Sequence, residues 1–189
     1  MLRYLFVLCV AVSLAACAAP AKVSAMVGAP SVPMAANSPL KQSIQVTSVV
    51  GGQDTNPLWT SQVASGDFQQ ALQQTLNRQQ ILTTTGARYK LDVALVEVKQ
   101  PFIGLTYTVT STVRYTLTEN PSGRVPFDQR ITADGIATVS DSPLGFERLR
   151  LANENSIKAN LSKFLDTLIQ MVGGRGMASI GTVEIHISG

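Results

Sequence analysis

Apolar and polar residues alternate most regularly over residues 105–118, and this period of two predicts a long β-strand. Residues 44–50 and 89–98 are rich in β-branched and apolar residues and predict two further strands. Residues 119–123 (Glu-Asn-Pro-Ser-Gly) predict a hairpin turn, after which residues 125–139 return as a fourth strand. The residues of this last strand that we expect to face inward are Phe127, Ile131, Ala133, Ala137 and Val139.

Two other stretches repeat their apolar residues at helical spacing. The first is expected to begin at residues 65–67 (Ser-Gly-Asp), where Ser65 or Asp67 would cap it, and to end near Gln80. The second is expected over residues 146–171, with the glycines of residues 173–176 breaking it. Residues 180–187 alternate and could add a short strand.

This order of elements favours an α+β fold. We expect a two-layer sandwich, in which two helices cover one face of a mostly antiparallel sheet of about four strands. The apolar side of residues 105–118 would face the helices. The opposite side would face solvent or a partner, and it consists of Thr106, Thr108, Thr110, Thr112, Arg114, Thr116 and Thr118, which we call the Thr-rich face.

Two interpretations of the Thr-rich face stay open. Threonine has a high β propensity and is an ordinary outward residue of a solvated sheet. A polar surface with few charges also suits contact with another protein, and Arg114 could meet an acidic partner or a lipid phosphate. Thr108, Thr110, Thr112 and Arg114 are therefore candidate partner-binding residues. Trp59 is a fifth candidate, because an exposed tryptophan often anchors an interface, although a core position is its alternative.

The first residues have the order of an export signal. Arg3 precedes an apolar run over residues 5–14, which is shorter than the roughly 20 residues of a membrane-spanning helix. The run ends in Leu14-Ala15-Ala16-Cys17, which resembles the lipobox of bacterial lipoproteins. This resemblance implies cleavage before Cys17 and acylation of that cysteine, which would anchor the chain to a membrane. The alternative is an ordinary signal peptide with an incidental cysteine.

The lipobox implies a division of the chain into three parts. Residues 1–16 would be the signal peptide, residues 17–41 a lipidated cysteine with a Pro/Ala-rich tether, and residues 42–189 a single periplasmic domain. Val32 and Met34 could still pack on that domain. By the same resemblance, Ala18 after the cysteine points to the outer membrane, with the domain in the periplasm.

Composition argues against several classes of function. The formal charge is +3 and only 14% of residues are charged, without a basic run, so we expect no nucleic-acid partner. The two cysteines are Cys9, which leaves with the signal, and Cys17, so no zinc-type spacing exists. His186 is the only histidine, and any Ser-His-Asp arrangement would depend on it. We expect no enzyme activity, no metal and no cofactor.

The domain resembles small proteobacterial lipoproteins of the YajG and LptE kind, in a branch without an assigned role. Four stretches carry the resemblance: residues 68–72 (FQQAL), 87–93 (ARYKLDV), 109–117 (VTSTVRYTL) and 147–154 (ERLRLANE). It implies a non-catalytic accessory lipoprotein of outer-membrane assembly or of lipid or lipopolysaccharide transport. Its partner would be an outer-membrane barrel or a transporter subunit.

Two alternatives to this function stay open. A periplasmic lipoprotein that binds a lipid or small ligand would need a cavity between the helices and the sheet. An envelope hydrolase is the second alternative, and it would need His186.

Overall fold

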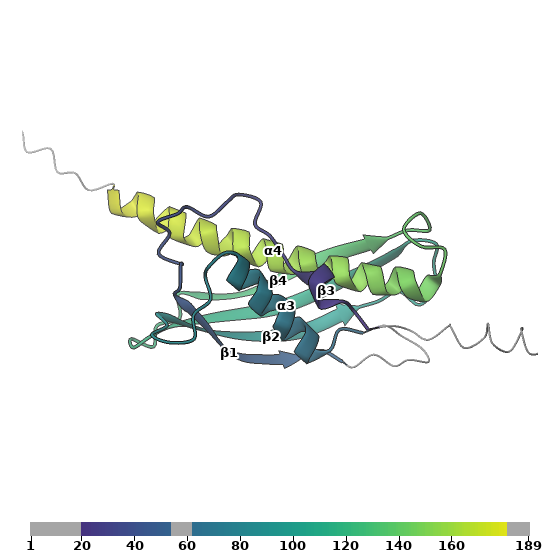
Figure 1. The fold of residues 1–189 in the computed structure, drawn as a ribbon, viewed down its shortest axis with the longest axis horizontal. Coiled ribbons are helices and arrows are strands. Elements are labelled where there is room, and N and C mark those ends of the chain that lie inside the picture. The colour runs from purple at the N-terminus through teal and green to yellow at the C-terminus, as the bar shows by residue number, and fades with distance from the viewer. Residues whose placement is uncertain (1–19, 54–61, 181–189) are drawn as a thin grey trace, which may run out of the picture.

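The computed structural model describes residues 20–53 and 62–180, in which four strands form one open sheet in the order β1-β2-β3-β4. β1 pairs with β2 in parallel, and the other neighbours are antiparallel. The three helices of the described chain lie on one face of the sheet, which confirms the predicted α+β fold and adds one short helix (Figure 1). The elements are α2 (Val23–Met26), β1 (Ile44–Gly51), α3 (Ser65–Arg78), β2 (Tyr89–Lys99), β3 (Tyr107–Glu119), β4 (Phe127–Ala137) and α4 (Gly145–Ile180).

The core lies between the sheet and the helices. Tyr115 of β3 stacks on Phe164 of α4, with ring centroids 3.9 Å apart and planes 6° from parallel, and Phe127 of β4 meets the same ring edge-on. The predicted inward residues of β4 are buried, whereas Val139 lies beyond the end of that strand and is exposed. The prediction for Val139 was wrong because the ladder with β3 ends at Ala137, after which the chain turns.

α4 lies unusually close to β4, and Gly135 makes this approach possible. A Cβ atom at Gly135 would meet the backbone nitrogen of Ser156 at 2.0 Å and the carbonyl oxygen of Ala152 at 2.3 Å. The helix also supplies side-chain donors to the strand: Asn155 donates to the carbonyl of Ile136 and Lys163 to that of Thr132. α4 thus protects β4, an edge strand of the sheet.

A small polar cluster lies inside the apolar layer, and we call it the polar seam. It joins Ser111 and Tyr115 of β3 to Ser156 and Asn160 of α4, all four buried. The hydroxyl of Ser156 donates to that of Ser111 (2.8 Å), and Asn160 donates to the carbonyl of Ile131 (2.8 Å). Burial raises the pKa of the Tyr115 hydroxyl well above its usual value, so this group stays protonated and donates to Asn160.

Two predictions about the helices were wrong in detail. α4 runs through the glycines of residues 173–176 as far as Ile180, because glycine costs about 1 kcal/mol in a helix but does not break it. Ile180 is therefore helical, and the rest of the predicted tail strand lies outside the described residues. α3 begins at Ser65 without a side-chain cap, and the hydroxyl of Ser65 donates to the carbonyl of Gly51 instead.

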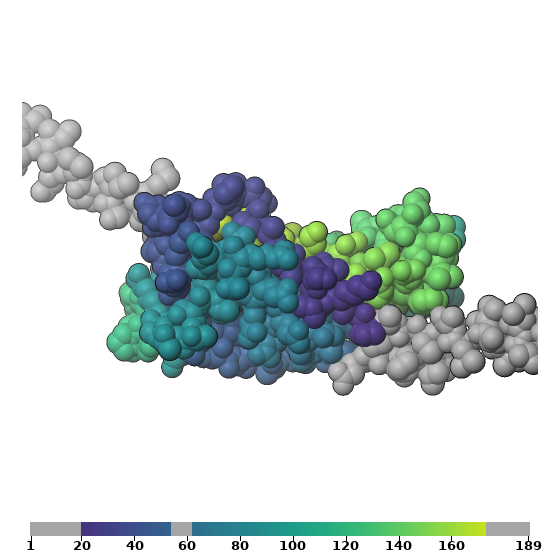
Figure 2. Space-filling model, in the orientation of Figure 1, coloured from purple at the N-terminus to yellow at the C-terminus, as the bar shows by residue number. Residues whose placement is uncertain are grey.

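The segment that the sequence predicts as a tether is packed on the domain from Ala21 onward. Met26 of α2 and Leu40 are fully buried, and Met34 packs against the core, while Val32 is exposed. Figure 2 shows this segment lying across α3 and α4. The composition is that of a spacer, but a few apolar side chains suffice to hold the segment on the helices.

Candidate functional site

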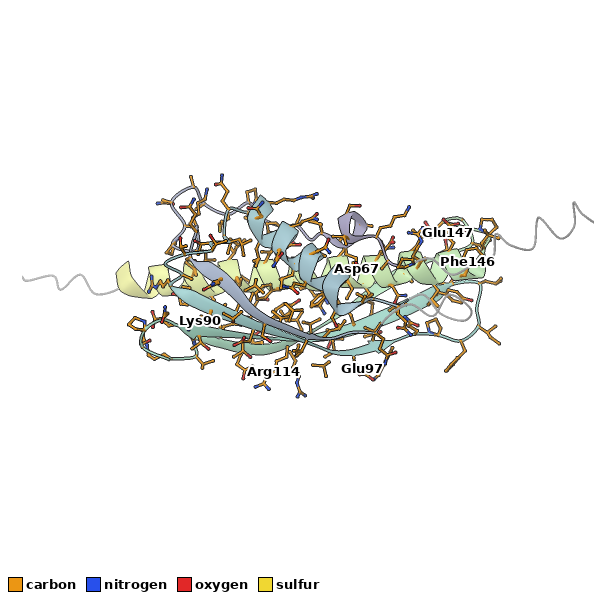
Figure 3. The ribbon with its side chains drawn as sticks, turned by 60° about the horizontal axis from the view of Figure 1, so that its bottom comes forward. Asp67, Lys90, Glu97, Arg114, Phe146 and Glu147 are labelled. Carbon is orange, nitrogen blue, oxygen red and sulfur yellow. The ribbon has the colours of Figure 1, made fainter. Side chains whose placement is uncertain are left out.

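The Thr-rich face is the side of the sheet that no described helix covers. Thr108, Thr110, Thr112 and Arg114 point away from the helices, as predicted, and none of them is buried. Figure 3 shows Arg114 on this side together with Lys90 and Glu97, whereas the side chains of α3 and α4 lie on the other. The structure therefore brings four of the five candidate residues together on one strand.

Most of these side chains have partners within the sheet. Thr110 donates to Asp134 (2.6 Å), and the hydroxyls of Thr112 and Thr132 lie 3.1 Å apart. These pairs join opposite residues of β3 and β4, so they tie the two strands together. The face is accordingly a preformed polar surface, and it carries more charge than the sequence predicts, because Lys90, Glu97 and Arg130 of the neighbouring strands share it.

Arg114 carries the clearest electrostatic feature of this face. Its guanidinium donates two hydrogen bonds to Asp128 of β4, at 2.8 and 2.6 Å, and Thr116 donates to the same carboxylate at 3.2 Å. The hydrogen bond from Arg114 is the main cause that lowers the pKa of Asp128, and the same pair raises the pKa of Arg114. Arg114 thus has an acidic partner within the chain, and a second acidic group would have to compete with it.

Three residues of interest from the sequence lie outside the described residues. These are the candidate lipid-attachment residue Cys17, the candidate anchor Trp59 and the only histidine, His186. Their roles stay predictions.

The described residues offer surface hollows. One, of about 400 Å³, lies at the ends of β1 and β2, between Gly51, Val63 and Val98. Another, of about 470 Å³, lies beside the β3–β4 hairpin at Glu119 and Pro126. Within residues 20–53 and 62–180, no group of three or more acidic, histidine or cysteine side chains is arranged to hold a metal ion.

A second surface feature is apolar, and sequence reasoning missed it. In the β2–β3 loop, Phe102 is 100% exposed, Ile103 91% and Leu105 75%. Leu144, in the loop before α4, is also exposed. We call these four residues the apolar tip. The sequence did contain a signal for this patch, because large apolar residues stand close together at positions 102–105, where a turn usually carries polar ones.

Arg148 holds the two loops of the apolar tip together. This buried residue of α4 donates to the carbonyls of Ser142 and Pro143 from Nη1, at 2.9 and 2.8 Å, and to that of Gly104 from Nη2, at 3.3 Å. Its guanidinium also lies over the ring of Tyr107, 5.3 Å from the centroid. The exposed apolar side chains therefore sit on loops that a buried cation fixes in place.

Several polar residues of the first turns of α4 are buried, among them Arg150 and Glu154. The pair Arg150–Glu154 forms as its i,i+4 spacing predicts, at 2.6 Å, but both side chains are less than one-tenth exposed. Oε1 of Glu154 also accepts the backbone N–H of Lys22 at 2.8 Å. These residues are covered because the N-terminal segment packs over them.

No protein-family model matches the chain, and no curated protein matches it. Solved structures share its fold. A crystal structure from Xanthomonas campestris, of the family DUF330, matches with a TM-score of 0.53 and 11% identity over 81% of this chain and 97% of that one. The crystal structure of a "putative lipoprotein" from Caulobacter crescentus matches with a TM-score of 0.50 and 15% identity over 71% and 93%. At these identities the likeness shows the fold alone, and the resemblance to YajG and LptE stays a prediction.

In the described part of the chain, no helix combines the length and the apolar character needed to cross a bilayer.

Proposed function

We propose that this protein is a lipoprotein of the bacterial envelope, anchored to the outer membrane through acylated Cys17, and that it acts without catalysis by contacting other proteins. The observation that carries the proposal is the Thr-rich face, a polar surface left open because every described helix covers the opposite face. The lipobox-like residues 14–17 support the anchor. The Caulobacter protein, which has the same fold and carries a lipoprotein description, supports it further. The partner would be a barrel or transporter subunit in outer-membrane assembly or lipid transport.

Acylation is tested by the intact mass of the protein purified from membranes. A mature chain that begins at Cys17 and carries the added mass of three acyl chains with a glyceryl group is expected. An unmodified Cys17 in a longer chain would exclude the anchor.

The contact surface is tested by photo-crosslinking in cells. A photoreactive residue in place of Thr108 or Thr112 should capture an envelope protein, because both positions lie on the open face. The matched control is Gln69, an exposed residue of α3. Equal capture from Gln69, or no capture from either threonine, would contradict the assigned surface.

A charge variant completes this test. Thr108→Glu should abolish the capture of the envelope protein by a photoreactive residue at Thr118 of the same face. Thr110 and Thr112 are left unchanged because a glutamate there would face Asp134 or Glu97, and like charges directly opposite each other destabilise a sheet. Unchanged capture would show that the open face is not the contact.

A further inference from the structure

The apolar tip is the strongest unexplained feature of the surface. Phe102 and Ile103 are almost fully exposed, although a folded protein usually covers large apolar side chains that stand next to each other. Residues 100–106 contain no charged side chain. In the neighbouring loop, the carboxylate of Asp141 accepts the N–H and hydroxyl of Thr138, at 2.7 and 2.9 Å, so it is engaged in its own turn.

The start of the described chain is directed toward this same end of the molecule. Lys22 contacts Glu154, Ala29 contacts Ser162, and Ser31 contacts Asp166. The segment thus runs beside α4 in the same direction as the helix. At Lys22 the segment therefore lies near the beginning of α4, which is the end of the helix where the apolar tip lies (Figure 1).

The lengths agree with this arrangement. Glu154 is nine residues after Gly145, which is about 14 Å along a helix that rises ~1.5 Å per residue. Cys17 is five residues before Lys22, and five extended residues span up to about 17 Å. Cys17 can therefore reach the level of the apolar tip.

We infer that the apolar tip inserts into the phospholipid surface that holds the acyl chains of Cys17. The inference rests on the proposed function, because the acylated cysteine supplies the membrane. Large apolar side chains on an uncharged loop suit the boundary between head groups and acyl chains. Acyl chains alone hold a protein without orienting it, and the tip supplies a second contact.

Insertion would give the domain a defined orientation. The β3–β4 hairpin lies at the other end of the sheet, because β3 runs away from the tip, and so would point away from the membrane. The strands would then run away from the membrane, and the Thr-rich face would be accessible from the side to proteins in the same membrane. In this orientation the apolar tip would contact the membrane, and the Thr-rich face would contact a protein in the same membrane.

Environment-sensitive fluorescence tests the inference on the full, processed protein. Phe102→Cys is labelled with a nitrobenzoxadiazole dye, and the protein is reconstituted in vesicles of phosphatidylethanolamine and phosphatidylglycerol. The thiol of Cys17 is blocked by its lipid, so the label is specific. Phe102 is fully exposed, so its replacement leaves the core intact. The matched control is Val125→Cys, an exposed site beside the β3–β4 hairpin.

Insertion predicts a several-fold rise and a blue shift of emission from position 102 in vesicles, with quenching by lipids that carry a nitroxide near the head group. Position 125 should keep the emission of a dye in water. Equal emission from both positions, with acylation confirmed by mass, would overturn the tip insertion and leave the lipoprotein assignment standing. If the emission from position 102 instead rises with the number of protein copies per vesicle and is not quenched by the nitroxide lipid, the tip contacts another copy of the protein. That result would also overturn the tip insertion. An unmodified Cys17 would overturn both proposals.

Discussion

The hydroxyl of Tyr115 on β3 donates to Oδ1 of Asn160 on α4 across 2.8 Å, and the Tyr115 ring stacks on Phe164 one helical turn further along. One strand residue therefore makes a directional polar contact and a large apolar contact with the same helix. Because Asn160 also donates to the carbonyls of Ile131 and Ser111, it binds both β3 and β4. The polar seam thereby sets the position of α4 along the sheet, which an apolar stripe alone leaves free to slide.

Asn160→Ala is expected to lower the free energy of unfolding by about 2–4 kcal/mol, because it leaves the buried Tyr115 hydroxyl without its acceptor and removes the hydrogen bonds from Asn160 to two strand carbonyls. Urea unfolding followed by circular dichroism measures the change. Lys158→Ala, at an exposed position of the same helix, is the control and should change stability little. Equal effects of the two substitutions would contradict a special role for the polar seam.

Gly135→Ala is expected to be more harmful than its one methyl group suggests. The added Cβ would lie 2.0 Å from the backbone nitrogen of Ser156, so α4 must move away from β4. We expect a loss of about 1–3 kcal/mol or more in the free energy of unfolding. Gly66→Ala, in α3 with no atom within 4 Å of the new Cβ, should be neutral or slightly stabilising. A Gly135→Ala protein as stable as the Gly66→Ala protein would show that this close approach does not constrain the fold.

Glu154→Ala is expected to release the N-terminal segment. The substitution removes the acceptor of the Lys22 amide and leaves the buried guanidinium of Arg150 without its closest partner, at a cost of about 3–5 kcal/mol. Cleavage by trypsin after Lys22 should become faster, and the Lys22 amide should exchange its hydrogen faster. Glu147→Ala is the control, because Glu147 contacts the same arginine but is 40% exposed. Unchanged protection of Lys22 in the Glu154→Ala protein would show that the segment is held elsewhere.

The pair Arg114–Asp128 is expected to make stability depend on pH in the acid range. Because the pKa of Asp128 is lower in the folded protein than its usual value of 3.8, the unfolded state takes up the proton first as the pH falls. The contribution of the pair is therefore fully present above about pH 5 and is lost as the pH falls through the folded pKa.

Asp128→Asn should therefore flatten the dependence of unfolding free energy on pH below pH 4, as urea titrations at a series of pH values would show. Asp134→Asn changes a carboxylate of the same strand whose hydrogen-bond partner is the hydroxyl of Thr110, so it is the matched control. If both variants flatten the curve equally, the effect does not come from the arginine pair.

Parts of the candidate surface could be predicted because they depend on local pattern. A strand exposes alternate residues, so the row from Thr108 to Arg114 shares one face wherever the strand lies. The apolar tip could not be predicted in the same way, because a turn has no fixed period and its exposure depends on what else packs there. The role of Arg148 could not be predicted either, because its hydrogen-bond acceptors come from two loops that are about 40 residues apart in sequence.

The sequence by itself determined the strands, the two main helices, the outward direction of the Thr-rich face and the lipobox-like residues 14–17. These features depend on the spacing of neighbouring residues, and local spacing is what a sequence displays. Only the tertiary structure decided that the N-terminal segment packs on α4 and that Arg150 and Glu154 are buried beneath it. Both outcomes depend on contacts between residues more than 100 positions apart, where the gain from burial and from paired charges outweighs the local preference of a Pro-rich chain to stay extended.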